Sequence, residues 1–276
     1  MTIRVMSHDD LCVVLNWAEK EGWNPGLDDA AAFHAADPSG FLIKTLDGQL
    51  VSAISVVNHT ADFAFLGLYL CKPEFRGKGY GMDIWRAGLA HAGHRVIGLD
   101  GVPDQQENYA RSGFVNCGKT VRYEGHLPCA PDPHVRCVSP QEISLLIDHD
   151  AKAAGIRRDA FARAWFAGSA NRQTMVLTKG TDITGFATFR RCCIGTKIGP
   201  FKASCEADAL ALLSSNPFCM PSEAAYIDIP DKSASFAKLL FQNNFTPVFE
   251  TARMYSGPAP KPVFATYQAI ASMELG

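Results

Sequence analysis

The sequence predicts an α/β fold (α+β with a mixed sheet) that occurs twice in tandem, each copy being a sheet flanked by helices. Three observations support this prediction. Segments with the periodicity of strands and of helices alternate along the chain, a proline-rich stretch divides it, and a similar order of elements starts again beyond that stretch. With 276 residues, 47% of them hydrophobic, the chain can bury one large core or two ordinary ones.

The first half, residues 1–126, begins with a short edge strand and a capped helix. Ser7 precedes apolar residues at helical spacing, which is typical of a helix N-cap. Asp47-Gly48 predicts a tight hairpin turn, and the aromatic and aliphatic run around Phe65 predicts a buried central strand. We expect strands at 3–6, 41–45, 49–57, 62–71, 96–100 and 114–124, and helices at 9–21, 28–36, 79–92 and 104–112.

Residues 127–134 hold three prolines in eight positions and form the clearest linker of the chain. In the second half, residues 135–276, Ser139 and Glu142 fit a capping box that starts a helix. We expect strands at 135–138, 174–178, 183–190, 197–201, 225–229 and 245–254, and helices at 140–154, 159–167, 205–213 and 233–243. The tail is expected to add a strand or helix at 263–270, packed on the second half.

The charge balance and hydropathy exclude two classes of partner. The formal net charge is −2 and the pI is about 6.4, whereas a nucleic-acid-binding domain normally carries a basic stripe. No apolar signal region follows Met1, and no window holds the run of about 18 apolar residues that a membrane span needs. We therefore expect no nucleic-acid partner and no membrane association.

The nine cysteines are odd in number, scattered and without C-x-x-C spacing. Together with the lack of an export signal, this pattern predicts reduced thiols and a cytoplasmic location. The adjacent Cys192 and Cys193 would point to opposite faces of a strand, and His91 and His94 fit a polar helix end better than a metal site. No metal is therefore expected.

A basic glycine-rich loop follows the central strand of the first half. Pro73 ends that strand because it has no N–H to donate. Residues 76–81, with the sequence RGKGYG, then open a helix. Bare N–H groups at a helix N-terminus beside two cations favour a phosphate group. The second half has a single glycine, Gly199, at the matching place, so we expect only the first half to bind a phosphate-bearing ligand.

Two spaced motifs resemble the GNAT superfamily, the Gcn5-related N-acetyltransferases. Residues 76–81 match its R/Q-x-x-G-x-G/A signature, and residues 109–114 match its later Y-x-x-x-G-F element. Residues 71–73 correspond to the family's V-x-P, with cysteine in place of valine. The resemblance covers residues 1–126, and the second half looks like the degenerate C-terminal domain of a two-domain bacterial subgroup. It implies tandem GNAT folds, each with a central mixed, mostly antiparallel sheet.

The resemblance implies that acetyl-CoA is the co-substrate. Its pyrophosphate would lie on the N–H groups of the loop, and its pantetheine arm would pair like an extra strand with the end of the central strand. One amide of that strand would polarise the thioester carbonyl. Asn108 is similar to a family asparagine that contacts the arm. The residues implicated in this way are Tyr69, Leu70, Cys71, Arg76, Gly77, Lys78, Gly79, Tyr80, Gly81 and Asn108.

The resemblance also implies catalytic roles. Tyr109 occupies the family's tyrosine position and would be the general acid that protonates the departing thiolate. Asp100 ends a predicted strand and would act as a base through water, unless it only shapes the turn that follows. The acceptor pocket is expected between the halves. Its candidate contacts are Trp23, Asn24 and Arg158, although Trp23 could instead anchor the core and Arg158 be a surface charge.

Together these features predict an acetyltransferase that moves the acetyl group of acetyl-CoA directly to the amine of a small molecule. Two alternatives stay open. A related tandem GNAT protein could transfer a longer acyl group, or an aminoacyl group from tRNA. An acyl-CoA-binding sensor or scaffold that has lost catalysis would keep the same loop.

Overall fold

The computed structural model describes residues 1–220, 222–263 and 265–276. Its strands are β1 (Thr2–Val5), β2 (Phe41–Leu46), β3 (Gln49–Asn58), β4 (Phe63–Cys71), β5 (Val96–Gly101), β6 (Val115–Gly125), β7 (Val135–Cys137), β8 (Arg172–Lys179), β9 (Asp182–Arg191), β10 (Thr196–Ala203), β11 (Ala225–Pro230), β12 (Thr246–Ser256) and β13 (Tyr267–Ala269). Its α-helices are α1 (His8–Lys20), α2 (Asp29–Ala36), α3 (Tyr80–Ala92), α4 (Gln106–Arg111), α5 (Ile143–Ala154), α6 (Asp159–Phe166), α7 (Glu206–Ser214) and α8 (Ala234–Gln242). Short 3-10 turns precede three of them: η1 (Pro73–Phe75), η2 (Pro103–Gln105) and η3 (Pro140–Glu142).

The predicted fold class is confirmed, and every expected helix and strand overlaps an observed one. Local signals explain several boundaries. The Ser7 hydroxyl accepts the N–H of Asp10 at 3.1 Å, and the Asp10 carboxylate accepts the N–H of Ser7 at 2.8 Å, so α1 begins at a capping box. Asp47 and Gly48 take φ values of 49° and 79°, as a two-residue hairpin turn between β2 and β3 requires.

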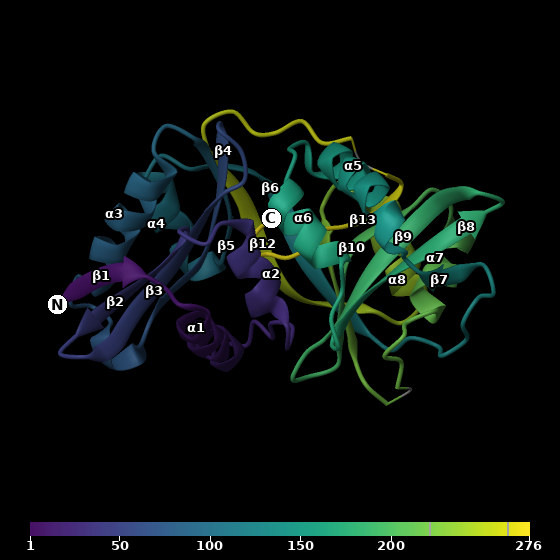
Figure 1. Ribbon diagram of the computed structural model, residues 1–276, viewed down its shortest axis with the longest axis horizontal. Helices are drawn as coiled ribbons and strands as arrows, with labels where there is room; N and C mark the ends of the chain where they lie inside the picture. The colour runs from purple at the N-terminus through teal and green to yellow at the C-terminus, as the bar shows by residue number, and fades with distance from the viewer. Residues whose placement is uncertain (221, 264) are drawn as a thin grey trace.

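The two halves exchange strands within one sheet. Among the described residues, the sheet runs in the order β1-β2-β3-β4-β5-β12-β6-β11-β10-β9-β8-β7, with β13 paired to β10. Strand β12 of the second half lies antiparallel between β5 and β6, and β6 of the first half lies antiparallel to β11. Figure 1 shows β12 beside β5, near the centre of the molecule. Each half is therefore completed by a strand from the other, although the halves are continuous in sequence.

The sheet is mixed and mostly antiparallel. In the part of the chain that the structure describes, the two parallel pairs are β4 with β5 and β10 with β11, one in each half. A shared hydrophobic core also joins the halves, because it contains side chains from α1, α2, α5 and α6. In it, Phe33 stacks on Trp165 with ring centroids 6.0 Å apart. Burying one such phenylalanine contributes about 1.5–3 kcal/mol, so we expect the two halves to unfold together.

The tail crosses from the second half to the first. Strand β13 confirms the extra element expected at 263–270 and pairs antiparallel with β10; Phe264, which falls in that range, lies outside the described residues. Beyond β13 the chain turns toward the first half, where Leu275 is fully buried. The C-terminus consequently lies at the centre of the molecule (Figure 1).

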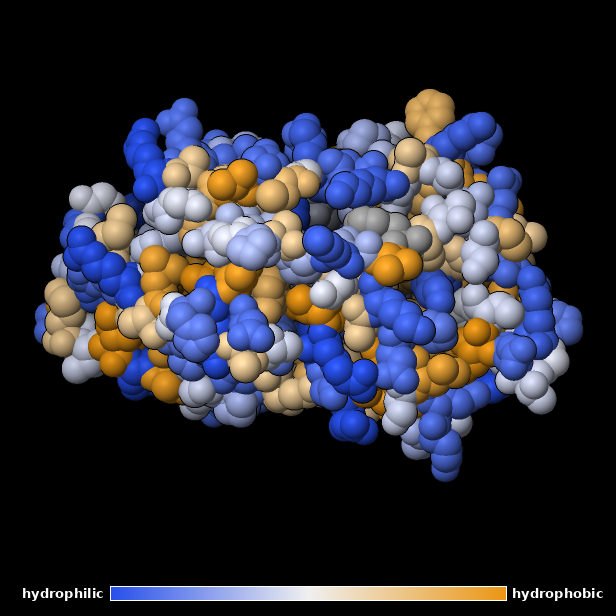
Figure 2. Space-filling model, turned by 90° about the horizontal axis from the view of Figure 1, so that it is seen from above, coloured by the Kyte–Doolittle hydropathy of each residue, from blue (hydrophilic) through white to orange (hydrophobic). Residues whose placement is uncertain are grey.

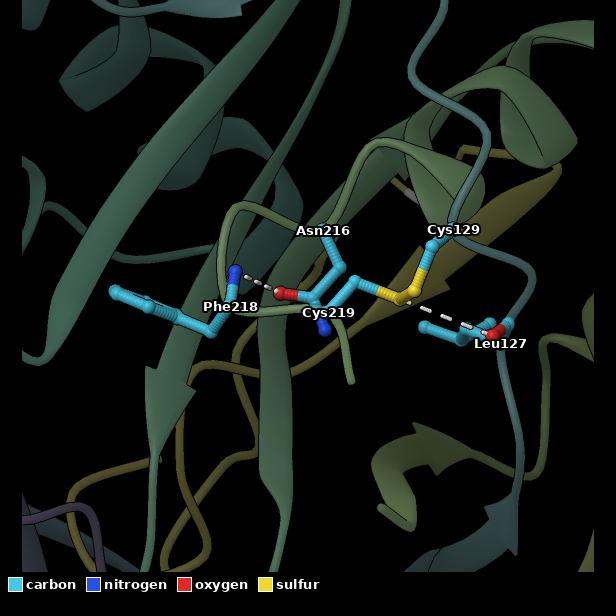
Figure 3. The surroundings of a disulfide bond; sticks show 5 residues. All are labelled: Leu127, Cys129, Asn216, Phe218 and Cys219. Carbon is cyan, nitrogen blue, oxygen red and sulfur yellow. Dashed lines mark hydrogen bonds between the residues drawn. A yellow bond between two sulfur atoms is a disulfide. The ribbon is translucent and has the colours of Figure 1, made fainter. Parts of the chain in front are cut away.

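Cys129 and Cys219 form a disulfide, so the expectation of reduced thiols throughout is wrong for this pair. Cys129 lies in the 127–134 linker and Cys219 in the loop after α7, where the Asn216 side chain accepts the N–H of Phe218 at 3.0 Å (Figure 3). The two cysteines are 90 residues apart, and folding alone brings them together, which is why their spacing carried no signal. The other seven cysteines, all in described parts of the chain, are free.

Figure 2 shows hydrophilic and hydrophobic residues interspersed over one face of the molecule, across both halves. Helices α1 and α3 have 13 residues each, whereas a membrane-spanning helix needs about 20. Over the described ranges, the chain has no helix with the length and apolar composition to cross a membrane.

We expect the disulfide to stabilise the fold. Cys219→Ser removes a cross-link that closes a 90-residue segment, and losing this constraint on the unfolded chain costs about 2–4 kcal/mol. Urea unfolding without reductant should show a lower midpoint for the variant than for the wild type. Cys117→Ser, which removes an exposed free thiol, should leave the midpoint unchanged. Equal midpoints for wild type and Cys219→Ser would contradict a stabilising disulfide.

Candidate active site

The central strand β4 separates from β5 partway along its length. Their parallel pairing runs from Phe63 opposite Val96 to Leu66 opposite Leu99, where it ends within the described residues. Leu68 takes a positive φ of 44°, and the pairing of β4 with β3 shifts register in the same region. Leu68 therefore lies in a bulge, and the sheet is open between the ends of β4 and β5.

The glycine-rich loop follows the open end of β4 directly. Gly77 and Gly79 take φ values of 75° and 82°, and Gly79 is the N-cap of α3. Among the described residues, no atom lies within 4 Å of a Cβ built on either glycine, so a ligand can approach this backbone. The first N–H groups of a helix have no acceptor within it, and the helix dipole favours an anion beside them. The loop therefore fits a phosphate group.

The two cations of the loop lie on its exposed surface. Arg76 forms an ion pair with Glu21, and its Nε donates to the Cys71 carbonyl at 2.9 Å. Lys78 Nζ donates to the Glu74 carbonyl at 2.9 Å. Exposed contacts of this kind are weak, so both side chains can turn toward a bound anion.

Tyr109, on α4, lies beside the opening between β4 and β5. Its ring stacks on Trp85 of α3 with centroids 5.5 Å apart, and the residue is only 7% exposed. Gly101 leaves room for the ring, because a Cβ built there would lie 3.0 Å from it. Burial raises the pKa of Tyr109 well above that of an ordinary tyrosine. The phenol therefore keeps its proton near neutral pH.

A cavity of about 60 Å³ lies between Tyr109 and the second half. We call it the splay cavity, because the diverging ends of β4 and β5 form one of its walls. Leu68, Tyr69 and Tyr109 line it on the side of the first half, and Phe249, Met273 and Glu274 on the side of the second. A reacting group in this cavity would contact both halves.

Asp100 also lines the splay cavity, but it is held in an ion pair. Arg253 of β12 donates to its two carboxylate oxygens at 2.9 and 2.6 Å, and the hydroxyls of Thr120 and Thr251 donate at 3.0 and 3.3 Å. Burial raises the pKa of Asp100, while Arg253 opposes that shift by favouring the ionised form. Asp100 and Arg253 are directly opposed in the sheet, so their ion pair links β5 to β12.

The structure brings Trp23 to the splay cavity, whereas Asn24 and Arg158 are not among the described residues that line it. The Trp23 carbonyl accepts from Lys197 Nζ at 2.7 Å, which ties its loop to the second half. The Asn24 side chain donates to the Ile194 carbonyl at 2.8 Å. Asn24 therefore fastens the same loop to the turn between β9 and β10.

Arg158 lies on the wall of a second cavity, of about 160 Å³. It forms a bidentate ion pair with Asp150 at 2.7 and 3.1 Å and donates to the carbonyl of Gly276. Its side chain is 3% exposed, so it is buried and not a surface charge. Its contacts hold the C-terminus in place.

The other candidate contacts for the cofactor lie on β4, α3 and α4. Tyr69 lines the splay cavity, and Leu70 and Cys71 complete β4 beyond the bulge. Gly81 allows Tyr69 to pack on α3, because a Cβ built on Gly81 would lie 2.8 Å from the Tyr69 hydroxyl. Asn108 is exposed on α4, where its amide donates to Gln105 at 2.9 Å.

Sequence reasoning missed the residues that the second half and the strand exchange bring to the splay cavity. Arg122, near the end of β6, forms a buried bidentate ion pair with Asp228 of β11 at 2.7 and 2.9 Å. Glu274 comes from the tail. One signal was available in the sequence. Arg122 is a cation inside a strand-forming run, and a charged side chain that is buried in a sheet needs a partner.

In the second half, the chain itself fills the corresponding opening. Strands β10 and β11 pair in parallel from Thr196 to Ile198, and the pairing of β10 with β9 shifts register just beyond Ile198. Strand β13 then pairs antiparallel with β10 from Phe201 to Ala203. The tail thus lies along β10 at the place where the first half leaves β4 open.

Comparison with known proteins gives matches over both halves. A model described as "Acetyltransferase (GNAT) family" matches residues 8–114, and one described as "Acetyltransferase (GNAT) domain" matches residues 146–266. A protein named Holothin acyltransferase, from Pseudoalteromonas sp. (strain SANK 73390), is 34% identical over 279 residues, covering 100% of this chain and 94% of that protein.

Solved structures share the fold. A putative acetyltransferase from Pyrococcus horikoshii superposes with a TM-score of 0.83 at 22% identity, covering 100% of this chain and 95% of that one. A tandem GNAT protein from the clavulanic acid biosynthesis pathway superposes with a TM-score of 0.59 at 13% identity, covering 94% and 99%. The full-length relative and the two domain matches show that the chain belongs to the GNAT acetyltransferase family, as an acyltransferase with two GNAT domains in tandem.

Proposed function

We propose that this enzyme transfers the acetyl group of acetyl-CoA directly to the amine of a small molecule. The observation that carries the proposal is the position of Tyr109, a buried phenol at the open ends of β4 and β5. The glycine-rich loop begins just beyond this opening. A donor bound on the loop would extend its thioester into the splay cavity, beside a proton source.

The loop and the end of β4 would bind the donor. The N–H groups of residues 77–81 would hold the pyrophosphate, with charge added by Arg76 and Lys78. The arm that carries the thioester would pair with the backbone of residues 69–71, where one amide would stabilise negative charge on the thioester oxygen. Asn108 would contact this arm from the exposed side of α4.

Direct transfer requires a proton for the departing thiolate. Tyr109 supplies it as general acid, because burial keeps the phenol protonated. Asp100 remains a proposed base through water, but its donors from Arg253, Thr120 and Thr251 occupy both carboxylate oxygens. This environment supports a structural role for Asp100 more than a catalytic one.

The acceptor would enter at the boundary between the halves and lie against Trp23. Asn24 and Arg158 would act indirectly, by fixing the Trp23 loop and the tail. The name of the full-length relative refers to holothin and to acyl transfer in general. Holothin is therefore the first acceptor to test, and a longer acyl group is the alternative donor.

Release of CoA tests the function. Purified enzyme should release CoA thiol from acetyl-CoA in the presence of holothin, benzylamine, tyramine or glucosamine, at a rate that saturates with the amine. Butyryl-CoA and hexanoyl-CoA in place of acetyl-CoA distinguish the longer acyl donors. Saturable binding of acyl-CoA without thiol release for any pair would instead indicate a sensor.

Gly79→Glu should weaken the binding of acetyl-CoA at least 10-fold in calorimetry, because it places a carboxylate where the pyrophosphate would lie and strains a residue with φ of 82°. Gly180→Glu is a matched control: Gly180 also has positive φ, 62°, and among the described residues nothing lies within 4 Å of a Cβ built there. The control should bind acetyl-CoA like the wild type. Equal affinities for Gly79→Glu and the control would refute the loop assignment.

Tyr109→Phe should lower kcat about 100- to 1,000-fold and leave the affinity for acetyl-CoA unchanged, because it removes only the proton donor. Since burial raises the pKa of Tyr109, wild-type kcat should not fall through loss of this proton below about pH 10, the ordinary tyrosine value. Tyr226→Phe, at a half-buried tyrosine on β11, should keep full kcat. Full turnover by Tyr109→Phe would remove Tyr109 from the mechanism.

A further inference from the structure

The end of the tail is held by both halves. After β13, the N–H of Ile270 donates to the Asp228 carbonyl of β11 at 3.0 Å. At the other end, His59 Nε2 donates to the Leu275 carbonyl at 3.0 Å. Residues 270–276 therefore form a fixed segment that leads from the filled opening of the second half to the open one of the first.

The tail meets β4 where that strand departs from β5. A Cβ built on Gly67 would lie 2.1 Å from the carbonyl oxygen of Glu274, so the backbone of the tail packs on β4 as closely as a glycine permits. Glu274 is 5% exposed and lines the splay cavity together with Tyr109. Glu274 of the second half thus lies on the wall of the same cavity that Tyr109 lines.

The Glu274 carboxylate has cations nearby but no direct ion pair with any of them among the described residues. Three cations are within its electrostatic reach: Arg122, Arg190 and Lys197. Each has another partner of its own, namely Asp228 for Arg122, Asp29 for Arg190, and the Trp23 carbonyl for Lys197. Glu274 can therefore accept a hydrogen bond from a group that enters the cavity.

We propose that Glu274 is the acceptor-side carboxylate of the active site, which binds the amine of the acceptor and takes a proton from it. The inference rests on the proposed function. Asp100, the other carboxylate on the cavity wall, is already paired with Arg253. A charge-assisted hydrogen bond from an ammonium group to Glu274 would orient its nitrogen toward the thioester.

The proton balance of the transfer closes with these two residues. Glu274 takes one proton from the ammonium group, and the lone pair so freed attacks the thioester carbonyl. The C–N bond forms and the C–S bond breaks, while Tyr109 protonates the thiolate. The nitrogen then returns a proton to the Tyr109 phenolate, and Glu274 releases its own proton to water. The products are the amide and CoA.

Glu274→Gln tests the proposal, because it keeps the size of the side chain and removes its charge. With holothin and with benzylamine as acceptors, kcat/KM for the amine should fall about 100-fold. The affinity for acetyl-CoA should not change. The acidic limb of the pH profile of kcat/KM should disappear in the variant, although the cations within reach of Glu274, namely Arg122, Arg190 and Lys197, and the Arg122 partner Asp228 are unchanged. Glu274→Asp should recover part of the lost activity.

Two controls separate this proposal from a structural role and from the proposed function. Glu250→Gln, at an exposed glutamate paired with Lys119, should keep wild-type kcat/KM and pH profile. If Glu274→Gln has wild-type kcat/KM and an unchanged acidic limb while the wild type turns over, Glu274 is not the acceptor carboxylate. If the wild type releases no CoA with any amine, the proposed function itself fails, and this inference with it.

Discussion

Strand β12 lies between β5 and β6 and joins the two halves into one sheet. Two ion pairs mark this exchange. Arg122 with Asp228, across β6 and β11, is buried, and Asp100 with Arg253, across β5 and β12, is partly buried. Removing one partner of a buried pair typically costs about 3–5 kcal/mol, and a slip of one residue would turn these side chains to the other face of the sheet. The pairs therefore favour a single register for the exchanged strands.

This register determines what lines the splay cavity. Strand β12 brings Phe249 to it, and β6 brings Arg122, so neither half alone contains the whole wall. The glycine-rich loop, by contrast, belongs entirely to the first half. Under the proposed function, the first half would hold the donor, and the boundary between the halves would shape the space for the acceptor.

The second half has lost the glycine loop, yet it keeps the framework of the fold. Its parallel pair β10 and β11 departs from regular pairing as β4 and β5 do, and β13 occupies the resulting edge of β10. The same tail then packs on Gly67 of β4. The tail therefore contacts both openings: β13 occupies the one beside β10, and the residues after it reach the one beside β4.

The order of elements, the capping box at Ser7, the hairpin at Asp47-Gly48 and the loop at residues 76–81 could all be predicted from the sequence, because each depends on residues close together in the chain. Motif spacing likewise pointed to Tyr109. The strand exchange, the Cys129–Cys219 disulfide and the burial of Arg158 became visible only in the folded chain. The same holds for the pairing of Asp100 and for the place of Glu274 on the wall of the splay cavity. Strand pairing and ion pairs join residues such as Asp100 and Arg253, which are 153 positions apart. No local pattern in the sequence shows which distant partner neutralises a given charge.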